Sequence, residues 1–181
     1  LAIAGTSIPV TAATVAADGR FTFSDVPGGQ YRLSVQGAGV TPLTAMLGTL
    51  DVLDTPFEVT GGGDVTGITV ALSATPTMVS GLVVDQLGRP SPEFAVVMFP
   101  ADPTKRLASA RRVSGVVKIG SDGRFKIEGL PPGDYLLAIV VDSDPDQLND
   151  GGFLDLIAQG AIPIHLTDGA RIEQTLKIGG G

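Results

Sequence analysis

Asp122-Gly123-Arg124-Phe125 reveals an internal repeat, because Asp18-Gly19-Arg20-Phe21 carries the same four residues 104 positions earlier (122 − 18 = 104). A period near one hundred residues is the size of one small β-sandwich and is too long for the unit of a solenoid. The sequence therefore predicts two tandem copies of one sandwich. Other matches at this offset are Pro27 and Pro131, Gly29 and Gly133, Tyr31 and Tyr135, Leu33 and Leu137, Leu50–Leu53 and Leu154–Ile157, Asp64 and Asp168, Ile68 and Ile172, and Leu72 and Leu176.

The same offset predicts how the chain divides into domains. The second copy opens with an expected strand that begins at Met78, so the first copy would begin about 26 residues before Leu1. We therefore expect an incomplete β-sandwich domain over residues 1–75, which lacks its first two strands, and a complete one over 76–181. The chain would then be a piece of a longer protein, or the missing strands would come from elsewhere.

Alternation of apolar and polar residues, together with many β-branched residues, predicts an all-β fold. Asp-Gly turns at residues 18–19 and 122–123 separate expected strands, and a short helix is expected at residues 152–159, ended by Gly160. The continuous apolar run from Tyr135 to Val141 predicts a strand covered on both faces. The expected strands are residues 8–16, 20–24, 30–36, 57–60 and 67–73 in the first copy, and 78–85, 94–100, 112–119, 123–128, 134–141, 162–167 and 171–178 in the second.

Composition and charge exclude several classes of function. The net charge of −7 disfavours nucleic-acid binding, because phosphate backbones repel an acidic surface. Cysteine is absent, which excludes disulfides and thiolate metal sites, and the single histidine excludes mechanisms that need two imidazoles. Tryptophan is absent as well, so few rings are available to stack on sugars or bases. No run of 18 apolar residues predicts a membrane span.

A longer pattern in the second copy resembles a known family. It begins with Gly81, Val83, Asp85, Gly88 and Pro90, and continues through Asp-Gly-x-Phe at 122–125 to Gly-Leu-Pro-Pro-Gly-x-Tyr at 129–135. This pattern resembles the bacterial carboxypeptidase regulatory-like domains, which share a prealbumin (transthyretin)-like sandwich. The resemblance covers residues 78–178, but only residues 18–31 and the last strand of the first copy, where residues 26–29 lack the usual double proline. It implies an exported, cell-surface or periplasmic module attached to enzymes or receptors, and it does not imply catalysis.

An acidic stretch is the densest cluster of possible ligands. Its carboxylates, on Asp142, Asp144, Asp146 and Asp150, alternate in a way that can converge on Ca²⁺. However, Pro145 interrupts the run, and no glutamate closes the loop as it does in an EF-hand. The alternative is a solvated loop that caps the following helix, and the sequence favours this alternative.

The remaining candidates also favour structural roles. His165 is an isolated histidine on an alternating strand, which is more often an exposed strand residue than a ligand. Tyr31 and Tyr135 each follow a Pro/Gly corner, so we expect each hydroxyl to bond back to the main chain, as in the tyrosine corner of sandwiches. No residue is predicted to be catalytic, to bind a cofactor or to bind a metal, and no cofactor is expected.

These observations predict a non-catalytic structural or protein-interaction module of a bacterial surface or secreted protein, in an extracellular, cell-surface or periplasmic location. The expected partner is a protein, or a second copy that associates through sheet edges, and neither nucleic acid nor a membrane span is expected. One alternative is the subunit of a surface fibre, completed by strand addition from a neighbouring chain. Another alternative is a carbohydrate-binding module, which the absence of tryptophan weakens.

Overall fold

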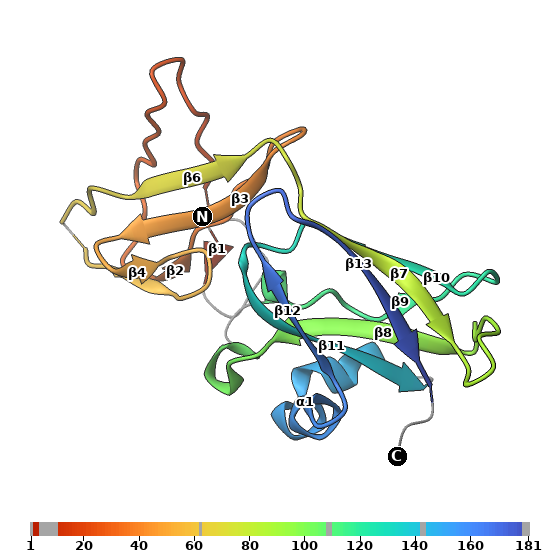
Figure 1. The fold of residues 1–181 in the computed structure, drawn as a ribbon. Helices are drawn as coiled ribbons and strands as arrows, with labels where there is room; N and C mark the ends of the chain where they lie inside the picture. Colours follow the sequence, from red (N-terminus) through yellow and green to blue (C-terminus); the bar gives the residue numbers. More distant parts are fainter. Residues whose placement is uncertain (1, 4–10, 62, 108–109, 142–143, 179–181) are drawn as a thin grey trace. The chain divides into compact units, whose positions relative to one another are not determined.

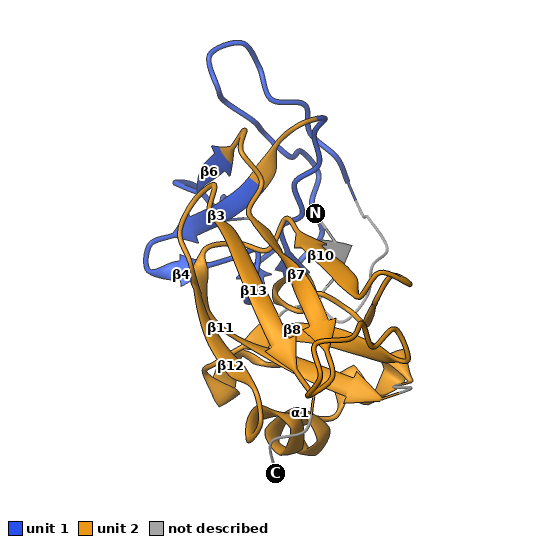
Figure 2. Ribbon diagram, turned by 45° about the vertical axis from the view of Figure 1, so that its right-hand side comes forward, with its two compact units in different colours: residues 1–38, 42–72 blue, residues 39–41, 73–181 orange. Residues whose placement is uncertain are grey.

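The computed structural model describes residues 2–3, 11–61, 63–107, 110–141 and 144–178. The chain divides into two compact units (Figure 2). Unit 1 consists of residues 1–38 and 42–72, and unit 2 consists of residues 39–41 and 73–181. The described residues are mostly β-strands, with one short α-helix in unit 2, so the all-β β-sandwich class is confirmed.

Unit 2 contains two sheets (Figure 1). In the sheet ordered β10-β7-β13, β7 pairs antiparallel with β10 and parallel with β13. In the sheet ordered β12-β11-β8-β9, all neighbours are antiparallel. The strands are β7 (Met78–Val84), β8 (Phe94–Pro100), β9 (Val117–Lys118), β10 (Arg124–Glu128), β11 (Gly133–Val141), β12 (Ile162–Leu166) and β13 (Arg171–Lys177).

The core of unit 2 lies between these two sheets. Alternation along β10 buries Phe125 and Ile127 while their neighbours stay exposed, as expected for a strand with one covered face. The same cluster takes side chains from every long strand of both sheets: Val79, Val83, Val96, Met98, Tyr135, Leu137, Ile164, Leu166 and Leu176. Because a face-to-face pair of sheets shares one apolar layer, this arrangement is a β-sandwich.

The outer face of β8 and β11 is also covered. Helix α1 (Gly151–Ala158) and the 3-10 helix η3 (Pro145–Asn149) lie over it (Figure 1) and bury Leu154 and Leu148. On the sheet side, this layer consists of Ala95, Val97, Phe99, Ala138 and Val140. The prediction that residues 135–141 form a strand covered on both faces is therefore confirmed as far as Val140, whereas Val141 is exposed.

Unit 1 contains two three-stranded sheets, ordered β1-β2-β5 and β4-β3-β6. The strands are β1 (Ala2–Ile3), β2 (Gly29–Arg32), β3 (Thr41–Leu47), β4 (Leu50–Asp51), β5 (Phe57–Val59) and β6 (Thr69–Ser73); Thr41 and Ser73 group with unit 2. Its core is smaller than that of unit 2 and consists of Tyr31, Leu33, Ala45, Val52, Leu53 and Phe57.

Most predicted strands of unit 2 are found within two residues of their expected ends, and the helix lies at 151–158 instead of 152–159. The prediction at 112–119 is wrong in extent, because only Val117–Lys118 joins the sheet. Residues 110–112 form the 3-10 helix η2 (Ala110–Arg112), and Ser114 instead bonds to Met98 through both its main-chain N–H and its side chain. Residues 112–119 therefore run beside β8 without a continuous ladder of main-chain hydrogen bonds.

Unit 1 departs further from the expected strands. Residues 11–16 and 20–24 form no strand, and residues 8–10 of the first expected strand lie outside the described residues. Strands β3 and β4 were not expected, because Gly39, Pro42 and Gly48 punctuate a segment with no clear alternation. Leu50–Asp51 is a strand, whereas its sequence match, Leu154–Asp155, is helical. The sequence similarity at these positions is therefore not accompanied by the same secondary structure.

Candidate functional site

Two tyrosine hydroxyls make the same hydrogen bond at matching positions of the two units. Tyr31 donates to the carbonyl oxygen of Pro27 at 2.9 Å, and Tyr135 donates to that of Pro131 at 2.7 Å. Both side chains are buried, at 4% and 1% exposure. The expected structural role of these hydroxyls is therefore confirmed, and neither tyrosine is available to stack on a ligand.

The Asp-Gly-Arg turns also have one geometry in both units. Asp18 accepts the main-chain N–H of Arg20 at 3.0 Å, and Asp122 accepts that of Arg124 at 3.1 Å. Gly19 and Gly123 adopt φ of 82° and 81°, which is a left-handed conformation that favours glycine. The strand environments that follow these turns nevertheless differ. Residues 124–128 form β10, whereas residues 20–24 form no strand.

A cavity of about 890 Å³ adjoins residues 20–24 of unit 1, which pair with no described strand. We call it the unit 1 cavity. Residues 19–26 line one part of it and residues 63–68 another, with Gly62 outside the described residues, and Phe57 and Val59 of β5 also contribute. Phe21 and Phe23 pack edge to face within the lining, with 5.9 Å between ring centroids. A cavity with several aromatic and aliphatic side chains in its wall is a candidate binding site.

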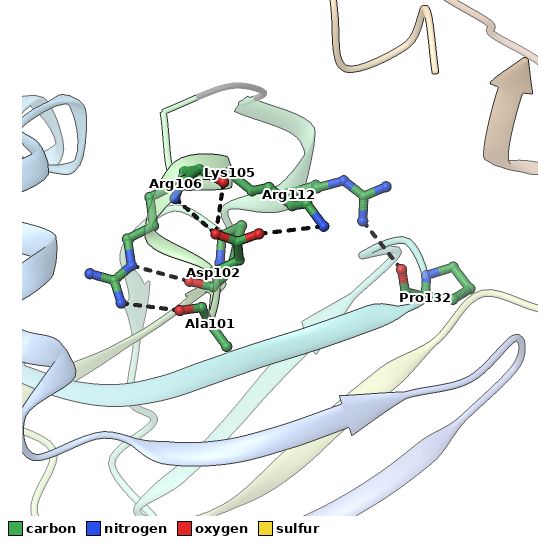
Figure 3. Close-up of polar contacts among 8 residues, drawn as sticks. Ala101, Asp102, Lys105, Arg106, Arg112 and Pro132 are labelled. Carbon is green, nitrogen blue, oxygen red and sulfur yellow. Dashed lines mark hydrogen bonds and ion pairs between the residues drawn. The ribbon is translucent and has the colours of Figure 1, made fainter. Parts of the chain in front are cut away.

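A buried arginine joins the loop after β8 to helix α1. Arg106 is 6% exposed, follows the 3-10 helix η1 (Pro103–Lys105) and lies 5.4 Å from the ring centroid of Phe99. Its guanidinium donates to the carbonyl oxygen of Ala101 at 3.3 Å (Figure 3). It also donates to the carbonyl oxygen of Pro100 at 3.3 Å, and it pairs with Asp155 of α1. Buried charges are normally paired in this way, so Arg106 has a structural role: it connects the loop after β8 to helix α1. Sequence reasoning missed this residue, because Lys105-Arg106 has the pattern of an exposed basic pair.

Two neighbouring basic residues, Lys105 and Arg112, also make contacts that stabilise the loop after β8. Lys105 pairs with Asp102 at 3.6 Å, and Arg112 donates to the carbonyl oxygen of Pro132 at 3.2 Å (Figure 3). The Arg112 contact connects the segment after η1 to the corner that carries Tyr135.

The acidic stretch caps helices. Asp144 accepts the N–H of Asp146 at 3.0 Å at the start of η3, and Asp150 accepts that of Gly152 at 2.8 Å at the start of α1. These are ordinary N-cap contacts, so the capping prediction is confirmed for these two residues. Asp142 lies outside the described residues. Within the part of the chain that the structure describes, no three acidic or histidine side chains are grouped to hold a metal ion.

His165 lies on the exposed face of β12. Its Nδ1 lies 2.6 Å from Oδ1 of Asp134, its direct neighbour in the antiparallel β11–β12 register. Both side chains are largely exposed, at 69% and 78%. This is an ordinary cross-strand pair, as the prediction of an exposed strand residue requires.

The first and last strands of unit 2 form its longest parallel contact. Strand β7 pairs with β13 over seven residues, from Met78 opposite Arg171 to Val84 opposite Lys177. Gly81 is required at the middle of this ladder, because a Cβ there would lie 1.7 Å from the carbonyl oxygen of Gln174. Gly81 thus permits a close approach of the main chains of β7 and β13.

No protein-family model and no curated protein matches the chain. Among solved structures, 91% of the chain is similar to 66% of GBS52, the minor pilin of Streptococcus agalactiae, at 15% identity and a TM-score of 0.42. Similarly, 70% of the chain is similar to 35% of BcpA, the major pilin subunit of Bacillus cereus, at 12% identity and a TM-score of 0.38. A DUF3823 family protein from Parabacteroides merdae is similar over 57% of the chain and 45% of its own, at 16% identity and a TM-score of 0.33.

The chain spans less than half of the length of the first four solved structures that match it. At these identities and TM-scores the matches carry no argument about function, which we therefore base on the residues of the chain itself. In the described residues no helix is both long and apolar enough to cross a membrane.

Proposed function

We propose that the chain is a non-catalytic structural module of a bacterial surface or secreted protein, and that unit 2 transmits mechanical tension. We further propose that its two units are copies of one carboxypeptidase regulatory-like sandwich. The matching Tyr corners and Asp-Gly-Arg turns support this relationship. A module of this kind spaces or presents the domains attached to it.

The observation that carries the proposal is the parallel β7–β13 ladder. Strand β7 opens unit 2 at Met78, and β13 closes it at Lys177. Tension applied through the ends of the unit pulls β7 toward its first residue and β13 toward its last. Because the strands are parallel, these pulls slide one strand along the other, and all the ladder hydrogen bonds are loaded together. Unzipping would load them one at a time.

The hydrogen-bond pattern predicts which residues would bear this load. The N–H of Ile178 donates to Val84 at 2.9 Å, and Met78 donates to Ala170 at 2.8 Å. Ladder bonds of a parallel pair recur at every second residue, so the main-chain N–H of Gln174 faces β7 and that of Thr175 faces away from it. Strand β13 lies at the edge of its sheet, where a proline whose N–H faces outward is tolerated.

Single-molecule stretching of the full chain, held at its two ends, tests the proposal. We expect Gln174→Pro to lower the force at which unit 2 unfolds, because it removes a ladder bond. Thr175→Pro is the matched control and should leave that force close to the parent value. Equal unfolding forces for the two variants would overturn the mechanical role of the β7–β13 ladder.

A second candidate function is that of an assembly subunit that makes protein–protein contacts through an open sheet. The unit 1 cavity favours it, because apolar side chains of residues 19–26 line a space beside a segment that pairs with no described strand. Unpaired strand segments are templates for strand addition.

A further inference from the structure

We infer that strand β13 is an interface at which a second copy of this chain pairs antiparallel, with Thr175 of both copies on the two-fold axis. In this register Glu173 of each copy lies opposite Lys177 of the other. The inference rests on the second candidate function, that of an assembly subunit, and it names the partner and the contact surface. The edge that it uses lies wholly within the described residues of unit 2.

Of the four sheet edges that the described residues of unit 2 form, β13 is the best suited to receive another strand. Strand β9 has two residues, and β12 contains Pro163, which has no main-chain donor. The edge of β10 is partly used already, because the carbonyl oxygen of Arg124 accepts the N–H of Gly120 at 2.8 Å. Strand β13 has seven residues and contains neither proline nor glycine. Such an edge presents a row of main-chain donors and acceptors to another chain.

The pairing with β7 determines which groups of β13 point outward. The N–H of Ile178 donates to Val84, and ladder bonds of a parallel pair recur at every second residue. The main-chain groups of residues 171, 173, 175 and 177 therefore face away from β7. The side chains of these four residues are exposed, whereas Leu176 on the opposite row is 2% exposed. The outward row consists of Arg171, Glu173, Thr175 and Lys177.

The charges on the outward row select one register. Full overlap of two β13 strands would place Arg171 opposite Lys177, and a register centred on Glu173 would place this residue opposite itself. Both arrangements bring like charges together, which is destabilising. A register centred on residue 172 pairs Arg171 with Glu173, but only residues 171–173 overlap. The register centred on Thr175 overlaps residues 173–177 and places Glu173 opposite Lys177 twice, which opposite charges favour.

Glu173 and Lys177 are available for these contacts. Among the described residues neither side chain forms an ion pair, and both are exposed. Charges on the opposite edge strand of the same sheet do pair within the chain, as Lys126 does with Glu128 at 2.7 Å. The second copy can therefore pair Glu173 and Lys177 without breaking an existing ion pair.

An apolar groove beside β13 supports the same register. It has a volume of about 310 Å³, and its lining comes from the end of β13 and from β11, β12 and α1. Its large apolar side chains are Leu137, Ile139, Leu156, Ile157, Ile162 and Leu176. In the register centred on Thr175, Ile172 of the second copy lies opposite Ile178, and both belong to the row of Leu176. The incoming strand thus brings an apolar side chain to the groove at each end of the interface.

Sedimentation velocity of the full chain over a range of concentrations tests the inference, and we expect a monomer–dimer equilibrium. Glu173→Lys and Lys177→Glu should each raise the dissociation constant of the dimer about tenfold, because each places like charges opposite each other twice. The double variant exchanges the two charges and should restore the parent value. Lys118→Glu makes the same charge change on β9, so it is the matched control and should leave the dissociation constant close to that of the parent.

Thr175→Pro tests the main-chain contact. Because the N–H of Thr175 faces away from β7, proline removes a donor at the centre of the interface and spares the β7–β13 ladder. This variant should be monomeric at concentrations at which the parent is dimeric. Its unfolding force in the stretching experiment should stay close to the parent value.

Three results would overturn the inference: a parent chain that stays monomeric at every concentration, single charge variants that associate as strongly as the parent, and a double variant that does not recover. Association that is equally strong in all the variants would retain the assembly function but place the interface away from β13. The stretching experiment uses single molecules and reports on the β7–β13 ladder without any association. Failure of the inference and failure of the mechanical function are therefore distinguishable.

Discussion

The hydroxyl of Tyr135 donates to the main-chain carbonyl of Pro131 across a buried corner, at 2.7 Å. Tyr135→Phe removes the donor and leaves that carbonyl without this partner, so we expect a loss of about 1–2 kcal/mol in the free energy of unfolding. Tyr31→Phe should cost less, because its bond to Pro27 is only partly buried. Urea unfolding followed by circular dichroism measures both changes. A Tyr135→Phe protein as stable as the parent would contradict the structural role.

Arg106 should contribute more to stability than its neighbour Lys105. Arg106→Ala removes a buried guanidinium that binds two carbonyl oxygens and pairs with Asp155, and we expect a loss of about 2–4 kcal/mol. Lys105→Ala is the control, and a change within about 0.5 kcal/mol is expected because its side chain is 64% exposed. Thermal or urea unfolding of the two variants makes the comparison. Similar losses in the free energy of unfolding for both variants would contradict the structural role of Arg106.

Gly81→Ala should disrupt the β7–β13 ladder. The added Cβ would lie 1.7 Å from the carbonyl oxygen of Gln174, so one strand must move. We expect a cost of about 3 kcal/mol or more, together with faster hydrogen exchange in β13. Ser80→Ala, at the adjacent residue of the same strand, is the control and should have a small effect. Normal stability of the Gly81→Ala protein would contradict the close approach.

Asp85 should titrate below the ordinary range of an aspartate. The main-chain N–H of Arg89 bonds to its carboxylate, the Arg89 side chain bonds to it as well, and these contacts lower the pKa of Asp85. Because the folded-state pKa is lower than the unfolded one, the stabilisation by this turn is present at neutral pH and is lost as the pH falls through the folded-state pKa. Carbon-detected NMR titration should show Arg89→Ala raising the pKa of Asp85. An unchanged pKa would mean that the side-chain bond contributes nothing.

Much of unit 2 could be predicted from the sequence, because its local signals agree with its tertiary contacts. The alternation at Phe125 and Ile127 places two side chains in the core, and the continuous apolar run from Tyr135 marks a strand that is covered on both faces. The repeated Pro/Gly corner likewise indicated the tyrosine hydrogen bonds. In these places the pattern of neighbouring residues is sufficient.

Prediction failed where pairing depends on distant segments. Residues 20–24 have the pattern of a strand, yet a strand needs a partner, and no described strand of unit 1 pairs with them. The matching sequences at Leu50 and Leu154 adopt a strand and a helix, because tertiary context overrides weak local preference. The burial of Arg106 and the parallel pairing of β7 with β13 likewise arise only when the chain is folded.

The most direct test of the mechanical role of the β7–β13 ladder compares two pulling directions within unit 2. The chain has no native cysteine, so introduced cysteines give unique attachment points. Pro76→Cys with Lys177→Cys loads the parallel β7–β13 ladder in shear. Pro76→Cys with Glu128→Cys instead unzips the antiparallel β7–β10 pair, in which Met78 lies opposite Glu128. We predict a clearly higher unfolding force for the first pair, and equal forces in the two directions would contradict the account.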